Sequence, residues 1–288
     1  MDDLYFEIEK DYNDLETFLK KKKLSQGFLG RSFRQGRVSV ENIPATKSMY
    51  VKKGEKVRIQ FEEEEIRIEP APFQQEILFE DKDLLVMNKK ANLAIMPCRS
   101  HPEKTFANEI AHYFQENGIS RKIRLLGRLD KDTTGVMIVC KNPYALYALE
   151  RNHTKNKIYH AIVCGQVKDC MHIDLPIGMG EDTMVREVRP DGQSAITELW
   201  PLKIGKEFTL VQLQLKTGRT HQIRCHLRHI GHPVLGDELY GGKRKNIGEI
   251  FLHVRELSIQ HPRTNEPMTF VAPYPKDKYE LARTLLET

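Results

Sequence analysis

The sequence predicts an α+β fold with two domains, the larger built on a mixed, largely antiparallel sheet and the smaller an α/β unit at the N-terminus. Strand-like segments of differing polarity alternate irregularly with helical segments, which favours this class over a doubly wound parallel sheet. An acidic run, FEEEEIRIEP, ends at Pro70 and is followed by Pro72, a composition typical of a linker. We therefore expect one domain over residues 1–69 and another over residues 70–288.

The overall composition is that of a globular intracellular protein. The 288 residues are 40% hydrophobic, enough for one large core and a small additional domain. The chain begins MDDLYFEIEK, which does not resemble a signal peptide, and no apolar run reaches the ~18 residues that span a bilayer. Five cysteines without any CxxC pair indicate reduced thiols. We expect a cytoplasmic protein that does not enter a membrane.

Charge is distributed unevenly in the first domain. Residues 1–20 contain seven acidic side chains and two lysines, whereas residues 21–58 contain eleven Lys and Arg against Glu41 and Glu55. One interpretation of the basic block is a solvated surface without a partner. A face that binds a polyanion is the favoured interpretation.

The small domain reads as two helices followed by short strands. NDLETFLKKK (13–22) has Asn13 as a candidate N-cap and places Leu15, Phe18 and Leu19 on one face. FLGRSFRQGRV (28–38) continues as a second helix that we expect to stop at Gly36. Residues 38–61 alternate apolar and polar around KKGEK, which predicts paired strands and a tight turn.

Residues 15–22, LETFLKKK, and residues 36–59, GRVSVENIPATKSMYVKKGEKVRI, resemble the alpha-L RNA-binding module first seen in a small-subunit ribosomal protein. In that family the basic helical face lies on structured RNA. The resemblance implies RNA-backbone contacts for five residues of this chain, namely Lys21, Lys22, Arg31, Arg34 and Arg37.

The larger domain alternates between helical and strand-like segments. TFANEIAHYFQ (105–115) and YALYALERN (144–152) have helical apolar spacing. GVMIVCK (135–141) is a continuous apolar run of strand length, which predicts a central position in the sheet. Further strand-like segments are 76–97, which contains two strands, 157–167 and 208–218.

The segment LLGRLDKDTTGVMIVCKN (125–142) places Asp130 between Arg128 and Lys131, just before the buried strand. A carboxylate in this position can cap backbone N–H groups of the following turn. Alternatively it is a reactive group, because the two cations favour its ionised form and Gly135 permits close approach of another backbone.

GRLDKDTTG resembles the Arg-Leu-Asp signature of pseudouridine synthases. These enzymes break the bond from N1 of uracil to the ribose, turn the base and rejoin it through carbon 5. The resemblance implies that Asp130 is the catalytic carboxylate, which either attacks the anomeric carbon or removes a sugar proton. It also implies that Arg128 contacts the RNA in the space left by the extruded nucleotide.

Tyr159 lies in the alternating segment NKIYHAIVCG (156–165). A half-buried strand tyrosine is one interpretation of this pattern. The resemblance implies instead that Tyr159 stacks on the flipped uracil and assists removal of the proton from carbon 5. Stacking of this kind contributes ~1–3 kcal/mol per base.

The segment KTGRTHQIRCHLRHIGHPVLGDELYGG (216–242) predicts a helix that starts near Thr220 and ends before Gly231. Arg219 stands at its entry, where the helix N-terminus favours anions. The resemblance implies that Arg219 forms a salt bridge with the catalytic carboxylate and is itself catalytic. Arg224 and Arg228 share a helix face, and we expect both to bind RNA.

The resemblance covers residues 75–275 and indicates the RluA-type branch, which modifies large-subunit rRNA or tRNA. Three features depart from that branch. Gly127 stands in place of the usual His, Thr134 in place of Ser, and VMNKKANLAIMP lacks the common Lys-Pro-x-Gly. The form Gly-Arg-Leu-Asp is also typical of the RsuA-type branch, which carries an alpha-L domain, but TGRTHQIRCHLRHIGHPVLGD is RluA-like throughout.

We expect no cofactor and no metal, RNA (rRNA or tRNA) as the partner, and a monomer. His221, Cys225 and His229 recur every four residues, but three ligands on one helix cannot readily close around one ion. Two rival functions stay open. One is a non-catalytic RNA-binding or ribosome-associated protein, and the other is a glycoside hydrolase with Asp237 or Glu238 as the second acid, ~5–10 Å from the first.

Overall fold

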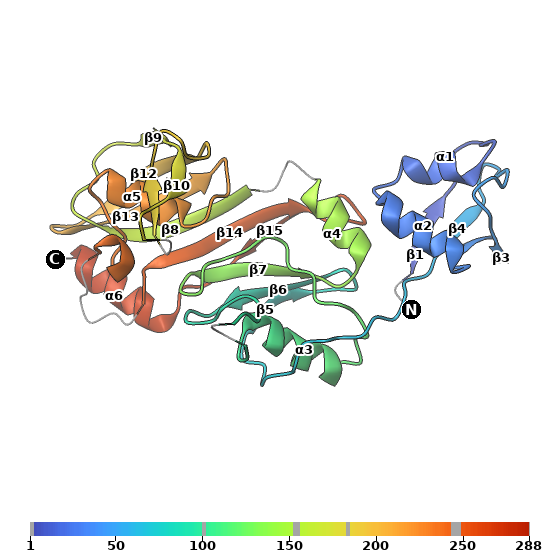
Figure 1. The fold of residues 1–288 in the computed structure, drawn as a ribbon, viewed down its shortest axis with the longest axis horizontal. Coiled ribbons are helices and arrows are strands. Elements are labelled where there is room, and N and C mark those ends of the chain that lie inside the picture. The colour runs from blue at the N-terminus through green and yellow to red at the C-terminus, as the bar shows by residue number, and fades with distance from the viewer. Residues whose placement is uncertain (1–2, 100–101, 152–155, 183–184, 243–248, 288) are drawn as a thin grey trace.

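The computed structural model describes residues 3–99, 102–151, 156–182, 185–242 and 249–287. Its N-terminal domain is a four-stranded antiparallel sheet in the order β1-β4-β2-β3, accompanied by two helices. The elements are β1 (Leu4–Glu7), α1 (Leu15–Lys20), α2 (Gln26–Arg34), β2 (Val38–Val40), β3 (Ile43–Pro44) and β4 (Lys56–Ile59). Figure 1 shows this domain at one end of the molecule's longest axis.

The helix and strand predictions for this domain are confirmed, with one correction at a helix start. The N-cap of α1 is Asp14, whose carboxylate accepts from the Thr17 backbone N–H at 2.7 Å, and not the neighbouring Asn13. Residues Leu15, Phe18 and Leu19 are buried as expected. The second helix ends before Gly36, whose φ of 65° is the left-handed conformation that favours glycine.

The larger domain contains a nine-stranded sheet in the order β5-β6-β7-β14-β8-β13-β12-β9, with β15 paired to β14. Its strands are β5 (Glu76–Glu80), β6 (Leu84–Lys89), β7 (Thr134–Cys140), β8 (Asn156–Cys164), β9 (Met171–Asp174), β12 (Ile196–Ile204), β13 (Phe208–Leu215), β14 (Leu252–Gln260) and β15 (Pro267–Val271). Of the pairings in this sheet, the one between β7 and β14 is parallel, and the others given for the described strands are antiparallel. The predicted α+β class with a mixed, largely antiparallel sheet is confirmed.

Strand β7 lies inside the sheet between β6 and β14, as its apolar sequence predicted, and all seven of its residues are buried. Gly135 permits the close approach of its parallel neighbour. A Cβ atom at this position would lie 2.2 Å from the Val254 carbonyl oxygen, and the φ of 110° is itself unfavourable for an L side chain. The close approach brings the end of the preceding loop, residues 127–133, next to β14.

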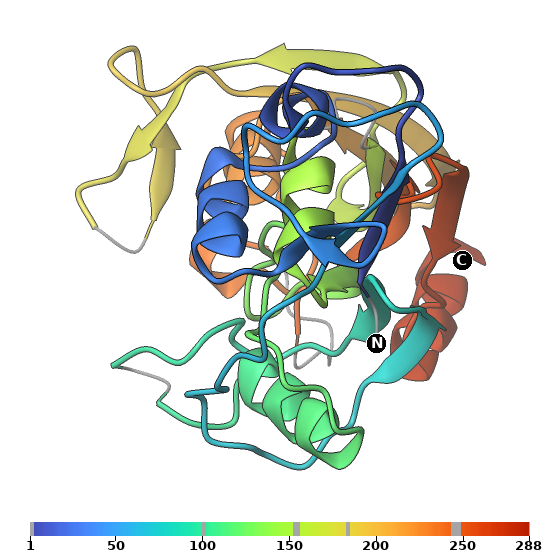
Figure 2. The same ribbon diagram turned by 90° about the vertical axis from the view of Figure 1, so that its right-hand side faces the viewer.

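Helices lie at several edges and faces of the sheet (Figures 1 and 2). The remaining elements are α3 (Phe106–Glu116), α4 (Pro143–Glu150), the small hairpin of β10 (Ile177–Met179) and β11 (Arg186–Val188), α5 (Gln222–His229), the short 3-10 helix η1 (Glu238–Tyr240) and α6 (Lys276–Glu287). Helix α5 packs against β11 and β12, whereas α4 packs against β7 and α6 against β13. In the described part of the chain, no helix combines the length and the apolar character needed to cross a bilayer.

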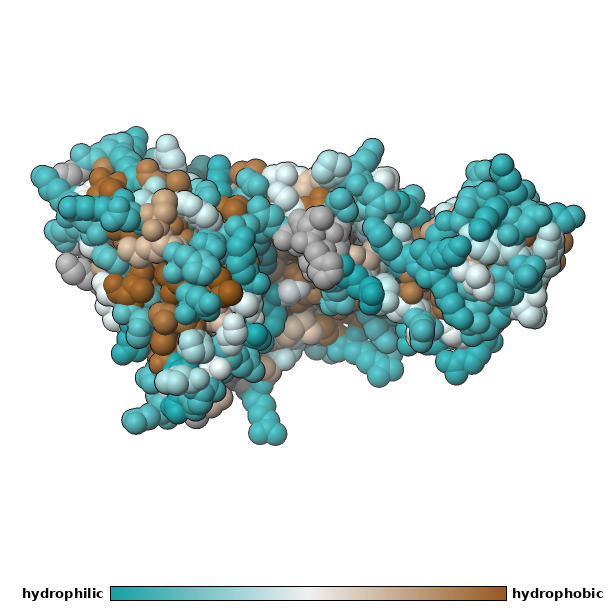
Figure 3. Space-filling view, turned by 90° about the horizontal axis from the view of Figure 1, so that it is seen from above, coloured by the Kyte–Doolittle hydropathy of each residue, from teal (hydrophilic) through white to brown (hydrophobic). Residues whose placement is uncertain are grey.

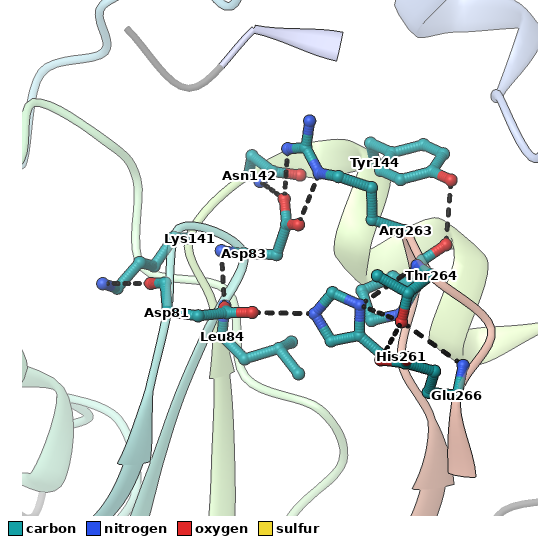
Figure 4. A network of polar contacts seen from close by, with 11 residues as sticks. Asp81, Asp83, Leu84, Lys141, Asn142, Tyr144, His261, Arg263, Thr264 and Glu266 are labelled. Atoms are coloured by element: carbon teal, nitrogen blue, oxygen red, sulfur yellow. Dashed lines mark hydrogen bonds and ion pairs between the residues drawn. The ribbon is translucent and has the colours of Figure 1, made fainter. Parts of the chain in front are cut away.

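The two domains meet where α4 and the β14–β15 turn face the N-terminal sheet. The Tyr144 ring of α4 packs into the N-terminal core and makes an edge contact with Phe6. Arg263 donates to both oxygens of the fully buried Asp83 at 2.7 Å (Figure 4). Its third nitrogen donates to the Asp3 carbonyl at 2.8 Å. One guanidinium therefore binds both domains.

Candidate active site

Asp130 lies in the loop that enters β7, and its side chain is 27% exposed. The Thr133 N–H donates to the Asp130 backbone carbonyl at 3.1 Å, which closes a tight turn over residues 130–133. Among the described residues no backbone N–H donates to the Asp130 carboxylate, so the side chain is not the cap of this turn. The carboxylate instead lies 3.7 Å from Arg224 Nη1 and 3.9 Å from His221 Nε2.

Arg224 connects Asp130 to a second carboxylate. Its Nε and Nη2 atoms donate to the two oxygens of Asp237 at 2.6 and 2.7 Å, which leaves Nη1 facing Asp130. The guanidinium also lies over the Tyr240 ring, 4.9 Å from its centroid. Because Arg224 and Asp237 are both buried, this two-fold hydrogen-bonded pair holds the guanidinium in one orientation.

The predicted salt bridge between Arg219 and Asp130 is wrong. Arg219 is exposed in the loop before α5 and donates through Nε to the Ser194 carbonyl at 3.0 Å. The helix begins only at Gln222, after His221 has adopted the left-handed conformation with a φ of 54°. This turn brings the first helical residues towards the Asp130 loop, so that Arg224 takes the place expected for Arg219.

The prediction that Arg224 binds RNA is also corrected. Its side chain is only 7% exposed, and two of its nitrogens donate to Asp237. Arg228, one turn later, is exposed. Arg128 is exposed as well and lines the hollows on both sides of Asp130. The assignment of these last two residues to RNA stays a prediction.

A hollow of about 440 Å³ opens beside Asp130, a volume typical of ligand pockets. Its apolar lining includes Tyr159 and Leu215 from neighbouring strands and Leu129 from the loop. Arg219 and Thr220 lie at the same hollow. A larger hollow of about 1110 Å³ adjoins it, and Asp130 and Arg224 line both. The carboxylate therefore stands at the junction of two open spaces.

Tyr159 is held on β8, where it is paired with Leu213 on one side and Val254 on the other. It is 8% exposed and presents part of its ring to the pocket. Burial, together with the negative charge of Asp130, raises the pKa of the Tyr159 phenol. The hydroxyl is therefore protonated at neutral pH, so the residue offers the pocket an aromatic surface and a neutral phenol.

His221, considered from the sequence as a metal ligand, lies beside Asp130. Its Nδ1 shares a 3.0 Å hydrogen bond with the Tyr240 hydroxyl. Burial lowers the pKa of His221, although the Asp130 charge acts in the opposite direction. Sequence reasoning missed Tyr240 altogether. Asp237 was the available signal, because a buried carboxylate in a Gly-Asp turn requires a cation. That cation is Arg224, and its guanidinium lies over the Tyr240 ring.

The residues expected to bind RNA in the N-terminal domain differ in their surroundings. Arg31 and Arg34 are exposed on one side of α2, and Lys21 is exposed beyond α1, where its ammonium lies 4.8 Å from the Tyr12 ring centroid. Lys22 is partly buried and pairs with Glu9 at 3.5 Å. Arg37 pairs with Glu62 at 3.3 Å, and its side chain is 14% exposed. Arg31, Arg34 and Lys21 are thus the most accessible of the five.

The sequence raised two further possibilities for the site, a metal and a second acid. Cys225 is buried and His229 is exposed, so they do not converge with His221 on one point. Among the described residues, the metal-ligand atoms that do converge are those of Asp81, Asp83 and His261, but Arg263 and Asn142 already donate to Asp83 (Figure 4). Both oxygens of Asp237 accept from Arg224, so Asp237 is not placed as the second acid of a glycosidase.

Comparisons with known proteins agree with the fold. The family described as RNA pseudouridylate synthase matches residues 83–229. An uncharacterized RNA pseudouridine synthase of Bacillus subtilis, YjbO, is 38% identical over 260 residues, which cover 87% of this chain and 91% of that protein. The ribosomal large subunit pseudouridine synthase D of Haemophilus ducreyi is 37% identical over 81% of this chain and 77% of its own length.

Solved structures give the same result. The human RNA pseudouridylate synthase domain containing 4 aligns with 74% of this chain and 93% of its own, with a TM-score of 0.59 and 25% identity. The human protein RNA Pseudouridylate Synthase Domain Containing 1 aligns over 77% of this chain and 98% of its own chain, with a TM-score of 0.61 and 24% identity, which supports the fold. The RluA-type resemblance in the sequence is confirmed by these matches, and the chain belongs to the RNA pseudouridylate synthase family of isomerases.

Proposed function

We propose that this enzyme forms pseudouridine in large-subunit ribosomal RNA and that Asp130 is its catalytic carboxylate. The proposal for the RNA rests on relatives named ribosomal large subunit pseudouridine synthase D, from Haemophilus and Vibrio species. A tRNA target is the alternative. The assignment of Asp130 rests on one observation, which is a partly exposed carboxylate at the wall of a 440 Å³ pocket with the buried Arg224 guanidinium behind it.

The target uridine has to leave its stack to reach this pocket, which costs a few kcal/mol and least in a loop or bulge. Once the uracil is in the pocket, Asp130 either attacks the anomeric carbon or removes a sugar proton. The bond from N1 to the sugar breaks, the base turns, a bond from carbon 5 to the sugar forms, and carbon 5 loses its proton. In this scheme the pocket has to accommodate both orientations of the base.

The neighbouring residues take distinct roles in the proposal. Arg224 directs the carboxylate, because its position is itself fixed by Asp237. Tyr159 supplies the surface against which uracil packs, and its neutral hydroxyl lies near the base. The exposed Arg128 at the rim binds the RNA backbone beside the extruded nucleotide. No cofactor is assigned a step in this scheme.

The N-terminal domain is proposed to be an alpha-L RNA-binding domain that binds structured RNA. Support comes from its two helices packed on a small antiparallel sheet and from Arg31 and Arg34, which are exposed on α2. Hydrophilic residues dominate the face of this domain seen in Figure 3. Contacts of this kind are electrostatic, so RNA affinity should fall steeply with salt. We further propose that the protein acts as a monomer in the cytoplasm, with a domain boundary near residue 70.

Tritium release tests the activity directly, because the hydrogen on carbon 5 of uridine is lost during isomerisation. Unmodified large-subunit rRNA labelled at that carbon should release tritium in proportion to pseudouridine formed. Release from tRNA but not from rRNA would reject the proposed target. Release from neither would favour the non-catalytic RNA-binding alternative. Mapping pseudouridines in cells that lack the protein would then identify the uridine.

A further inference from the structure

Lys89, the last residue of β6, is a fully buried lysine whose ammonium is surrounded by backbone carbonyls of the Asp130 loop. Its exposed fraction is 0%. Nζ donates to the carbonyl oxygens of Lys90 and Lys131 at 2.9 Å and of Thr133 at 3.0 Å, and it lies 3.4 Å from that of Asp130. Three of these four carbonyls belong to the 130–133 turn.

The sheet brings these distant residues together. Lys89 pairs with Gly135 in the β6–β7 register, so its side chain emerges beneath the entry to β7. The Asp130 carbonyl also accepts from the Thr133 N–H and the Lys131 carbonyl from the Leu93 N–H. A hydrocarbon side chain at position 89 would leave the carbonyls of Lys90 and Thr133 without their Lys89 donor. Buried carbonyls without a partner are unfavourable, so an ammonium with three N–H groups is well matched to this site.

Lys89 does not border either of the two hollows beside Asp130. Its three N–H groups face backbone oxygens, and its contacts with the loop are to main-chain atoms. It therefore has no access to a bound nucleotide. Any effect of Lys89 on the reaction has to pass through the conformation of the loop that carries Asp130.

We propose that Lys89 is a positioning residue, whose ammonium holds the 130–133 turn in the conformation that points the Asp130 carboxylate into the pocket. This inference rests on the proposed function only in so far as it concerns catalysis. Its structural content, the organisation of the turn by one buried cation, is independent of the substrate.

The protonation of Lys89 gives this arrangement a dependence on pH. Burial lowers the pKa of Lys89 to about 7, and the positive charge of Lys278 acts in the same direction, while Asp132, Asp130 and Glu249 oppose it. As pH rises through this value the ammonium becomes an amine with two N–H groups, one fewer than its close carbonyls. The turn should then rearrange around the buried amine without exposing it to solvent, and kcat should decline on the alkaline side.

Stability should change with the opposite sign. The folded protein binds the Lys89 proton less tightly than the unfolded chain, in which the lysine pKa is about 10.4. The contribution of Lys89 to the free energy of unfolding therefore rises between pH 7 and about 10. A fall in kcat over this range that accompanies equal or higher stability cannot be attributed to unfolding.

The test compares three variants of the full chain, with rRNA tritiated at carbon 5 of uridine as the probe. Lys89→Met removes the donors and keeps the chain length, and it should lower kcat by about 10- to 100-fold, as expected for a catalytic group displaced by about 1 Å, with KM changed less than about two-fold. Lys89→Arg retains a permanent charge and should lose the alkaline decline. Met87→Ala, a buried truncation two residues earlier on β6, is the matched control for lost stability and should keep kcat within about three-fold.

A second measurement depends on neither activity nor mutation. The backbone amide chemical shifts of residues 130–133 in the wild-type protein should titrate with a midpoint near pH 7, the pKa of Lys89. Shifts that do not change between pH 6 and 8.5, or a Lys89→Met variant with wild-type kcat, would overturn the inference. A wild-type protein that forms no pseudouridine but shows this titration would reject the proposed function and retain the role of Lys89.

Discussion

Replacing Arg224 with methionine tests whether its guanidinium, and not that of Arg219, directs the Asp130 carboxylate. Arg224 is 6% exposed and its partner Asp237 is fully buried. Removing one member of such a pair typically costs about 3–5 kcal/mol in folding free energy, because the other charge is left without a counterion. The same change removes the positive charge 3.7 Å from Asp130. Arg224→Met should therefore lose both stability and activity.

A second substitution distinguishes these two losses. In Arg224→Met combined with Asp237→Leu, both members of the buried pair are apolar, and most of the lost stability should return. The activity should not return, because Asp130 still lacks its guanidinium, and a deficit of about 100-fold in kcat is expected for a misplaced catalytic group. Chemical denaturation measures the first quantity, and tritium release from labelled rRNA at saturating concentration measures the second.

Arg219→Met is the matched control, since it removes the same kind of side chain from the same pocket. Arg219 is exposed and its Nε serves a backbone carbonyl, so stability should change by less than about 0.5 kcal/mol and kcat by only a few-fold. The reasoning is refuted if Arg219→Met loses as much kcat as Arg224→Met, or if the double variant recovers full activity together with its stability.

Three other predictions concern the base, the domain contact and the RNA. Tyr159→Phe should lower kcat by about 10²–10⁴-fold if the hydroxyl transfers the carbon-5 proton. Because the raised pKa of Tyr159 keeps the phenol neutral, the ratio of the variant's kcat to that of wild type should stay constant from pH 6 to 9. A kcat ratio that varies over this range would contradict a neutral phenol. Although burial opposes it, hydrogen bonding from Arg263 lowers the pKa of Asp83. The stability advantage of wild type over Asp83→Asn, measured by thermal unfolding, should therefore be fully present above about pH 4 and decline as pH falls through the lowered pKa. An advantage that is already lost well above pH 4 would argue against the pair. Arg31→Ala with Arg34→Ala should weaken all RNAs similarly and lower the slope of log affinity against log salt by about two, and an unchanged slope would remove both residues from the interface.

The local features of this fold were readable from the sequence because neighbours in the chain determine them. Gly36 ends a helix by adopting a positive φ, and the run 135–141 becomes a central strand because it is apolar throughout. Even the error at the first helix is local, since Asn13 and Asp14 are both suitable caps and the register of the buried residues selects the second.

The geometry of the site was harder to predict because it depends on residues distant in the chain. The choice between Arg219 and Arg224 follows from one left-handed residue, His221, and from a buried partner 13 positions after Arg224. The contacts between Lys89 and the Asp130 loop join positions 41 to 44 residues apart. Periodicity and motif spacing contain no information about such pairings, which arise from the strand order.

The resemblance in the sequence identified the family and Asp130, and it was correct about the family. It named Arg219 as the partner of that carboxylate, where the structure has Arg224. A motif with three arginines within ten residues does not by itself indicate which of them faces the Asp130 loop. In the structure, Arg224 faces Asp130 whereas the Nε of Arg219 donates to the Ser194 carbonyl, and these contacts decide the question without reference to a relative.

Turnover by Asp130→Asn tests the central claim most directly. The amide has nearly the same shape as the carboxylate but is neither a comparable nucleophile nor a base, so the variant should bind labelled rRNA with an affinity within a few-fold of wild type and release no tritium above background. Sustained release from this variant at a rate near that of wild type would show that the reaction does not depend on the carboxylate at position 130, and the account of the site would be wrong.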